Sequence, residues 1–304
     1  MSRLPITKTP KVYVGGAFIR SESARVFPLQ DVAGNFFANI PQCSRKDLRN
    51  AVEAAAKAGP GWAKRTPYNR GQIIYRLAEM LEARKADMLD ALLVGAAATP
   101  PRNGSAGGRG RPPSRTAALR EITATIDRLI YYAGWADKYE QVLGSVNPVA
   151  APYFNFTVTE PMGIVGVLAP DEAPLLALVS LLAPVITSGN TAVALASTTQ
   201  PYPAIVLGEM LATSDLPGGV VNLLTGFRKE MVPTFATHTH LRALVGVANA
   251  DDRKVLKLGA AESVKRVKLH RAEDPIDWFS DKAQSLYELR DTLEFKTTWH
   301  PVGA

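Results

Sequence analysis

The strongest nucleophile in this chain of 304 residues is its one cysteine, Cys43. A cysteine thiolate can attack a carbonyl carbon and form a covalent intermediate, and a nearby helix N-terminus lowers a thiol pKa. Cys43 stands in the run Pro41-Gln42-Cys43-Ser44, directly ahead of a predicted helix. We favour the simpler interpretation of an ordinary loop cysteine. No cysteine follows it, so the rest of the chain supplies no other thiol.

Three further groups of side chains carry the types that chemistry uses. His238 and His240 flank one residue, a spacing that could ligate a metal, but no acid or cysteine joins them nearby, so a loop is the better interpretation. His270 could act as a base near neutral pH, and an exposed or interface histidine is the alternative that we favour. Asp171 and Glu172 precede a predicted helix, where the helix dipole favours solvated carboxylates.

The composition describes a globular protein with a positive charge. Hydrophobic residues make up 46% and charged residues 21%, and the net charge is +7. More than half of that charge comes from one Pro, Gly and Arg-rich segment, 98–116, which contains Arg102, Arg109, Arg111 and Arg115 and no acid. Because the segment has no aromatic residues to stack bases, we expect a solvated, flexible insert and no specific nucleic-acid binding.

The chain shows no signal for secretion or for a membrane. The first residues contain no apolar stretch of the kind that signal peptides have. The longest apolar run, 173–186, is too short to span a bilayer and contains two prolines. One cysteine excludes an intrachain disulfide, so we expect a protein of the reducing cytoplasm.

The first half of the sequence predicts mainly helices. A hairpin is expected around Gly15-Gly16, in an otherwise strand-poor lead. Ser44 and Asp47 form a capping-box pattern that opens a helix over 45–59. Thr66-Pro67 opens a long helix with apolar positions to Leu92, and a third helix is expected over 117–142. Residues 153–158 alternate apolar and polar types, as one arm of a hairpin would.

From Gly163 on, strands and helices alternate strictly. Strands are predicted over 164–169, 191–196, 220–225, 244–248 and 264–269, and helices over 174–186, 204–213, 230–236 and 252–262. This order predicts an α/β fold, a doubly wound, Rossmann-like parallel sheet of about five strands with helices on both faces. A last helix over 276–293 and a closing strand over 294–299 are expected to follow.

Several stretches together resemble the aldehyde dehydrogenase superfamily, in that family's order and at about its spacing. They are VYVGGAFIRSESARVFPLQDVAG (12–34), AVEAAAKAGPGWAKRTPYNRGQIIYRLAEMLEARKADM (51–88), YYAGWADK (131–138), EPMGIVGVLAP (160–170), LLAPVITSGNTAVALAS (181–197), LPGGVVNLLTG (216–226) and ESVKRVKL (262–269). The resemblance implies the family's cofactor-binding domain and its protruding oligomerisation hairpin.

The departures from the family fall on its reacting groups. The family's oxyanion-stabilising Asn is matched here by Glu172, and an ionised carboxylate accepts hydrogen bonds but cannot donate one. The family's general-base Glu is matched by His270, which has no nucleophile to serve. The resemblance therefore implies a chain without a working catalytic site.

The cofactor positions are degenerate in the same comparison. The Lys and Glu that bind the adenosine ribose in the family are matched by Leu195 and Thr198, and the Gly-Ser-Thr turn begins here at Ala248 with two carboxylates behind it. The residues left for a weak, degenerate cofactor site are Pro170, Ser197 and Gly226. We expect no cofactor, or NAD(P) bound with weakened affinity, and no metal.

The resemblance also implies that the chain keeps the family's oligomerisation elements and lacks its catalytic domain. The expected organisation is an N-terminal helical region over 1–145 with the insert 97–116, a hairpin over 146–160, a βα core over 161–273, and a tail over 274–304 with one helix and a strand. The residues expected to mediate assembly are Tyr153, Phe154, Phe156, Val158, Phe295, Thr297 and Trp299.

Three hypotheses on function follow from this sequence. The first is an inactive subunit, or pseudoenzyme, that assembles with a full-length aldehyde dehydrogenase or with itself. The second is an NAD(P)-dependent oxidoreductase acting on the aldehyde or oxo group of donors through another set of residues. The third is a regulatory module that binds a dinucleotide without chemistry, which the loss of the ribose-binding residues disfavours.

Overall fold

A seven-stranded sheet forms the centre of the computed structural model, which describes residues 8–31, 33–94 and 113–303. Its strand order is β11-β10-β7-β8-β9-β1-β2. β1 (Val12–Val14) and β2 (Ala17–Ile19) form the predicted hairpin and extend the sheet antiparallel at β9, which the sequence did not indicate. The other strands run parallel as predicted and are β7 (Ile164–Leu168), β8 (Thr191–Leu195), β9 (Val221–Leu224), β10 (Leu241–Ala248) and β11 (Arg266–Arg271).

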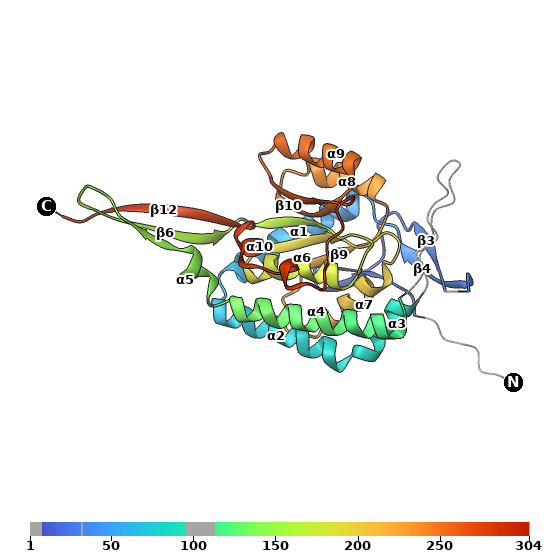
Figure 1. Ribbon diagram of the computed structural model, residues 1–304. Coiled ribbons are helices and arrows are strands. Elements are labelled where there is room, and N and C mark those ends of the chain that lie inside the picture. The colour runs from blue at the N-terminus through green and yellow to red at the C-terminus, as the bar shows by residue number, and fades with distance from the viewer. Residues whose placement is uncertain (1–7, 32, 95–112, 304) are drawn as a thin grey trace.

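Helices cover both faces of this sheet (Figure 1). Side chains alternate along a strand, so Val165 and Val167 of β7 pack into one core while Ile164 and Leu168 pack into the other. One face carries α1 (Arg45–Ala63), α8 (Arg228–Thr237) and α9 (Ala250–Ala261). The opposite face carries α6 (Leu176–Thr187) and α7 (Tyr202–Leu211), with further helices packed against them. The doubly wound α/β architecture is therefore confirmed.

Two long helices of the first half are each divided in the structure. The helix predicted from Pro67 to Leu92 consists of α2 (Pro67–Ala83) and α3 (Lys85–Leu93), because Arg84 between them has φ −109° and ψ 28°. The helix predicted over 117–142 consists of α4 (Arg115–Trp135) and α5 (Tyr139–Leu143). α4 begins inside the predicted insert 98–116, whose residues up to 112 lie outside the described ranges of the chain.

The helix predicted over 276–293 is wrong. The segment contains a short 3-10 turn (Asp281–Ala283) and the five-residue helix α10 (Leu286–Arg290). The carbonyl oxygens of Trp278 and Ala283 accept hydrogen bonds from the Arg128 guanidinium at 2.9 and 2.8 Å. The apolar spacing that suggested one long helix comes from a largely irregular segment whose buried side chains, Trp278 and the α10 residue Leu289, pack against the core.

The N-terminal region ahead of α1 contains more strands than the sequence suggested. β3 (Val26–Gln30) and β4 (Phe36–Pro41) form a second hairpin, so the expectation of a strand-poor lead is wrong. Phe27, Leu29 and Ile40 alternate inward and are buried. Pro28 lies between them on the exposed side, and a proline inside a short strand weakens the sequence signal.

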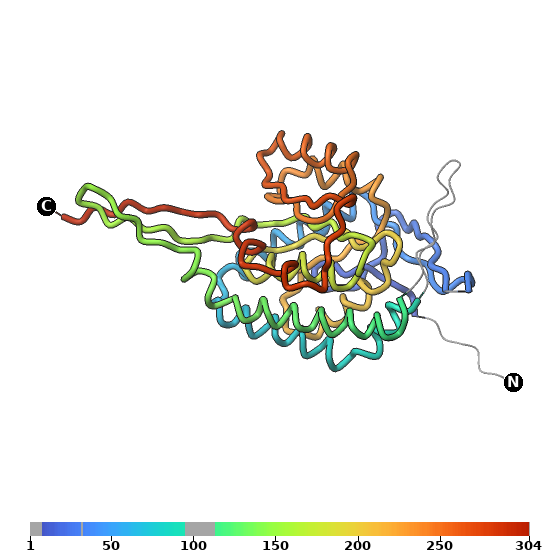
Figure 2. Tube along the Cα trace, viewed as in Figure 1, coloured from blue at the N-terminus to red at the C-terminus, as the bar shows by residue number. Residues whose placement is uncertain are grey.

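A three-stranded ribbon projects from the body of the molecule (Figures 1 and 2). Its central strand β6 (Tyr153–Pro161) pairs antiparallel with β5 (Ser145–Asn147) and, on its other side, with β12 (Leu293–Pro301). β6 and β12 match over their full lengths, from Leu293 opposite Pro161 to Pro301 opposite Tyr153. The strand predicted over 294–299 is thus confirmed and brings the end of the described chain back to the ribbon.

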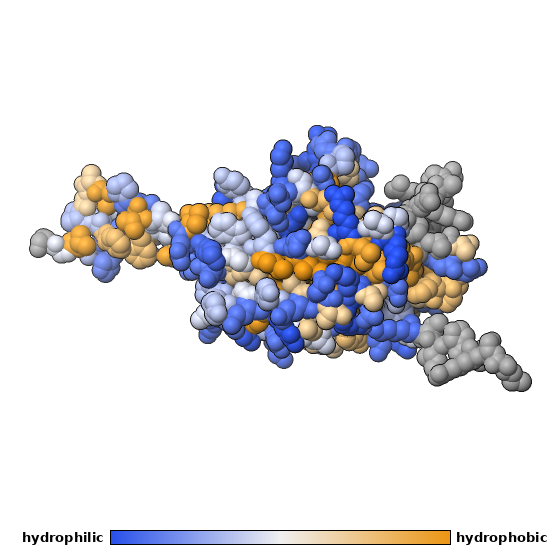
Figure 3. Space-filling model, turned by 60° about the horizontal axis from the view of Figure 1, so that its bottom comes forward, coloured by the Kyte–Doolittle hydropathy of each residue, from blue (hydrophilic) through white to orange (hydrophobic). Residues whose placement is uncertain are grey.

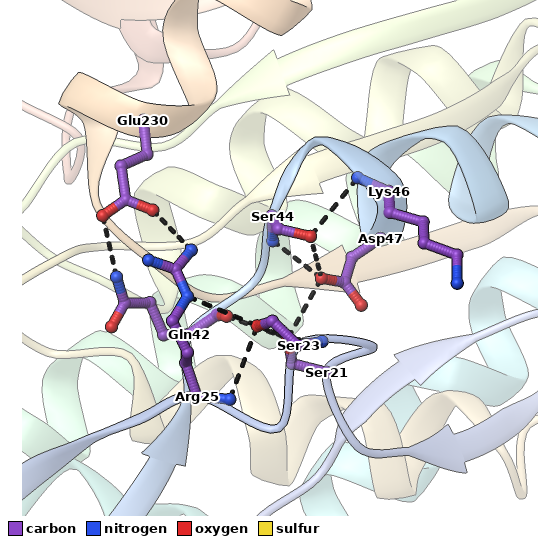
Figure 4. A network of polar contacts seen from close by, with 8 residues as sticks. All are labelled: Ser21, Ser23, Arg25, Gln42, Ser44, Lys46, Asp47 and Glu230. Carbon is purple, nitrogen blue, oxygen red and sulfur yellow. Dashed lines mark hydrogen bonds and ion pairs between the residues drawn. The ribbon is translucent and has the colours of Figure 1, made fainter.

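The capping box at the start of α1 is also confirmed. The Ser44 N–H donates to the Asp47 carboxylate at 2.7 Å, and the Ser44 hydroxyl accepts from the Lys46 N–H at 3.3 Å. Asp47 also accepts from the Ser21 hydroxyl, which belongs to a polar network that reaches Glu230 of α8 (Figure 4). No helix among the residues that the structure describes is long and apolar enough to cross a membrane.

We expect Ser44→Ala to lower the free energy of unfolding by about 1 kcal/mol, because α1 loses its N-cap acceptor. Ser23→Ala is the control outside the helix, since the exposed Ser23 hydroxyl bonds the Ser21 hydroxyl at 2.9 Å and accepts from Arg25 at 3.4 Å but caps no helix, and we expect it to cost less. Urea denaturation followed by circular dichroism measures both changes. Equal stability of the two variants would show that the capping box contributes nothing.

Candidate functional site at the carboxyl ends of the strands

The sheet has one position at which its strand order reverses direction. β7, β8 and β9 follow one another toward one side, and β10 and β11 lie on the other side of β7. In open α/β sheets, ligands bind in the crevice outside the carboxyl ends of the strands at such a switch point. The ends of β7 and β10 therefore mark the candidate site of this fold.

Four residues that the sequence singled out, Asp171 among them, meet in a small pocket at this switch point. Pro170, Asp171 and Glu172 follow β7, and Ala248 ends β10. The pocket has a volume of about 150 Å³. Its remaining lining consists of Arg228, Val247, Asn249, Asp252 and Ala272. Carboxylates dominate its charged groups, so the pocket offers little attraction to an anion.

Hydrogen bonds join the ends of neighbouring strands beside this pocket. The buried Ser197 hydroxyl, after β8, donates to the Asp171 carboxylate at 2.6 Å and accepts from the Gln200 N–H at 2.9 Å. The Thr198 hydroxyl donates to the Gly226 carbonyl at 3.3 Å. Leu195 is buried in the core and presents no polar group. The polar groups of the predicted cofactor site at Ser197, Thr198 and Gly226 thus bind other segments of the chain.

The sequence reasoning missed Arg228, the first residue of α8. Its guanidinium donates to the carbonyl oxygens of Ala169, after β7, and of Val247, in β10, the latter at 3.0 Å. The Asp252 carboxylate lies 3.9 Å away, and the Arg228 side chain is 20% exposed. Burial lowers the pKa of Arg228, while the surrounding carboxylates oppose that shift. The helix dipole disfavours a cation in the first turn of a helix. An arginine at the start of this helix is therefore unusual, and this is the sequence signal that could have revealed Arg228.

The N-terminus of α9 faces the same pocket and has its own acceptors. The Asn249 side-chain oxygen accepts from the Asp252 N–H at 2.8 Å, as an N-cap residue does. The Glu273 carboxylate accepts from the Ala250 N–H at 3.1 Å. Two of the N–H groups that an anion would use at this helix end are therefore bound by the protein itself.

The predicted histidines do not join this pocket. His270 lies on the outer strand β11 and is half-buried, and burial lowers its pKa. His238 and His240 stand before β10, at the opposite edge of the sheet, with ring centroids 6.0 Å apart. Within residues 8–31, 33–94 and 113–303, no three His, Cys, Asp or Glu side chains are grouped to hold a metal ion.

Cys43 lies beside the end of β9, and its N–H donates to the Thr225 carbonyl at 2.9 Å. Its side chain is fully buried, and burial, with the nearby Asp47 carboxylate, raises the pKa of the thiol to about 12. Because the thiolate is the nucleophilic form, this cysteine is inert at neutral pH. The residues on either side of it, Gln42 and Ser44, belong to the polar network of Figure 4.

We expect iodoacetamide at pH 8 to alkylate Cys43 more than tenfold more slowly in the native protein than in the urea-unfolded chain. The unfolded thiol ionises near its ordinary pKa of 9.0, whereas the native thiol stays protonated at this pH. Intact-mass spectrometry over time measures both rates. Fast native alkylation would mean that the thiol is accessible and ionised, contrary to this environment.

The sheet and its switch-point pocket define a doubly wound, Rossmann-like α/β domain that carries a projecting ribbon. The family model described as aldehyde dehydrogenase family matches residues 18–271, so the chain belongs to that family. Retinal dehydrogenase 2 of Gallus gallus is 31% identical over 269 residues, 86% of this chain and 48% of that protein. The mitochondrial aldehyde dehydrogenase of Rattus norvegicus is 27% identical over 270 residues, 86% of this chain and 49% of its own length.

The likeness extends to solved structures. An aldehyde dehydrogenase from Bacillus cereus, solved as its NAD+ complex, superposes with a TM-score of 0.77 and 24% sequence identity, over 87% of this chain and 51% of that one. At this identity the likeness establishes the fold. The chain spans about half the length of the relatives that it matches.

Proposed function

We propose that this chain is a non-catalytic member of the aldehyde dehydrogenase family that assembles with an active, full-length member through its ribbon. The observation that carries the proposal is a ribbon with apolar side chains on both faces. Register and alternation place Tyr153, Phe295 and Trp299 on one face, and Phe154, Phe156 and Val158 on the other. Hydrophobic residues are visible on the projecting ribbon in Figure 3.

The exposure of these side chains supports an assembly role. Tyr153, Phe154, Val158 and Phe295 are each 40–46% exposed, and Trp299 is 58% exposed. Large apolar side chains exposed together on a small element indicate a surface that another protein covers. The outer edge of β12 adds backbone groups that pair with no strand among the described residues, and such an edge favours pairing with a second chain.

The reacting groups support a role without catalysis. Cys43 is buried with a raised pKa, Glu172 cannot donate a hydrogen bond to an oxyanion, and His270 is not among the residues that line the switch-point pocket. These groups therefore supply neither a nucleophile nor an oxyanion donor for aldehyde oxidation. Assembly with an active family member would give this fold and its ribbon a function that requires no catalysis by this chain.

Co-expression tests this function directly. The tagged chain is produced together with the untagged full-length aldehyde dehydrogenase of the same organism, and the complex is isolated through the tag and sized by light scattering. We expect a stable complex that contains both chains, whereas the tagged chain purified alone shows no NAD+-dependent oxidation of a panel of aldehydes. A monodisperse monomer that captures no family member, or turnover by the purified chain, would contradict the proposal.

A further inference from the structure

The switch-point crevice of this chain contains a protein side chain where a doubly wound fold offers room for a ligand. We infer that the Arg228 side chain occupies and closes this crevice, and that the chain does not bind a nicotinamide dinucleotide there. The inference goes beyond the proposed function, because a non-catalytic subunit could still bind a cofactor. Four properties of the crevice support it: the position of Arg228, the remaining space, the charge and the state of the hydrogen-bond donors.

Arg228 occupies the position at which the two diverging strands end. Its guanidinium bonds to the Ala169 and Val247 carbonyls, which belong to the ends of β7 and β10 at the switch point. One planar group with several donors thus bridges the two strands. A dinucleotide lying in this crevice would have to displace the guanidinium and leave both carbonyl groups without their donor.

The space that remains around Arg228 is small. The pocket measures about 150 Å³. Pockets that bury small organic ligands typically measure about 300–1,000 Å³, and a dinucleotide is larger than most such ligands. The crevice as it stands therefore does not admit the cofactor without a rearrangement of its lining.

The charge of the crevice is unfavourable for a phosphate. Asp171, Glu172 and Asp252 line the pocket, and Glu273 binds the α9 N-terminus beside it. Arg228 is the one cation among the described residues that line the pocket; Asp252 at 3.9 Å opposes its charge, and two carbonyls accept its N–H groups. A pyrophosphate carries negative charge, so these carboxylates oppose its approach.

Two of the hydrogen-bond donors at the N-terminus of α9 are already used. A helix N-terminus binds phosphate through free backbone N–H groups. At α9 the Ala250 N–H donates to Glu273 and the Asp252 N–H donates to Asn249. The residues of this crevice are therefore not complementary to the family's dinucleotide. Instead, the chain's own side chains close the crevice.

Titration calorimetry of the whole wild-type chain with NAD+, NADH and NADP+, each up to about 1 mM, tests the exclusion of the cofactor. We expect no saturable heat and no shift in the thermal unfolding midpoint with any of the three. A dissociation constant of about 0.1 mM or tighter for any of them would overturn the inference, because bound ligand raises the midpoint by mass action. This test does not depend on assembly, so it can fail while the proposed function holds.

Arg228→Met tests the bridging role, with Lys229→Met as the matched control. Both variants remove one positive charge from the first turn of α8, but the Lys229 side chain makes none of the contacts that Arg228 makes to the two strand ends. We expect the Arg228 variant to unfold a few degrees lower, since two carbonyls lose their donor, and the Lys229 variant to unfold within about one degree of wild type. If Arg228→Met does not fold, Arg228→Lys provides the test and is expected at an intermediate midpoint. An Arg228 variant as stable as its control would overturn the inference.

Discussion

Phe154→Glu is expected to weaken the complex with the full-length family member by at least about a hundredfold. Phe154 is 46% exposed on β6, on the ribbon face that also carries Phe156 and Val158. If that face is buried by the partner, the new carboxylate loses its water without gaining a donor, at a cost of about 3 kcal/mol or more. Surface plasmon resonance with the immobilised partner measures the change in dissociation constant.

Phe36→Glu is the matched control for this experiment. Phe36 is a phenylalanine on strand β4 with 64% exposure, away from the ribbon. The substitution should leave the affinity and the thermal unfolding midpoint close to wild type. If both glutamate variants bind the partner equally well, the ribbon face that carries Phe154 does not contact the partner. That result would contradict assembly through this face.

The fold was predictable from the sequence where the local spacing of apolar residues matches the side chains that are buried in the structure. β7 to β10 are short apolar runs separated by helices, and the strand β12 was predicted because it resembles a family element that returns to the hairpin. The segment 276–293 was not predictable in this way. Its apolar spacing matches a helix, but tertiary hydrogen bonds from Arg128 to Trp278 and Ala283 hold it as a loop, and such long-range bonds leave no local trace.

Only some residues of the candidate site were predictable, because the site too depends on contacts between residues that are distant in sequence. Pro170, Glu172 and Ala248 were identified by the family positions that they match, and the structure brings them into one pocket. Arg228 was overlooked because an arginine between a strand and a helix usually lies in solvent. Its role depends on two carbonyl groups, 59 and 19 residues away in sequence, which only the sheet order brings together.

Two arginines, the partly buried Arg228 and the buried Arg128, therefore have comparable structural roles at different places on the sheet. Arg228 joins β7 to β10, and Arg128 of α4 joins the helical layer to the segment that leads into β12. Arg128 is 4% exposed, and burial lowers its pKa. Its guanidinium is satisfied by Ser180 and by two carbonyls of a segment that has little regular structure of its own. Arg128 thus holds the segment before β12, while Asn190 and Arg266 bind the carbonyls of Thr292 and Leu293 at the start of the strand.

Arg128→Met is accordingly expected to lower the free energy of unfolding by about 3 kcal/mol, because a buried carbonyl, a part-buried carbonyl and the Ser180 hydroxyl lose a charged donor. Arg120→Met is the control on the same helix. Arg120 is exposed and contacts the same segment through the Phe279 ring, at 4.5 Å, so its loss should cost about 1 kcal/mol or less. Urea denaturation measures both values.

Limited proteolysis separates a local effect of Arg128 from a general loss of stability. If the guanidinium holds residues 276–293 in place, trypsin should cut the Arg128→Met variant within that segment, at Lys282 or Arg290, under conditions in which the Arg120→Met variant stays intact. Cleavage there would cut the covalent connection between the body and β12, which begins at Leu293 and stays paired with β6. Arg128→Met with wild-type stability and an uncut segment would instead mean that apolar packing by Trp278 and Leu289 suffices to hold the loop.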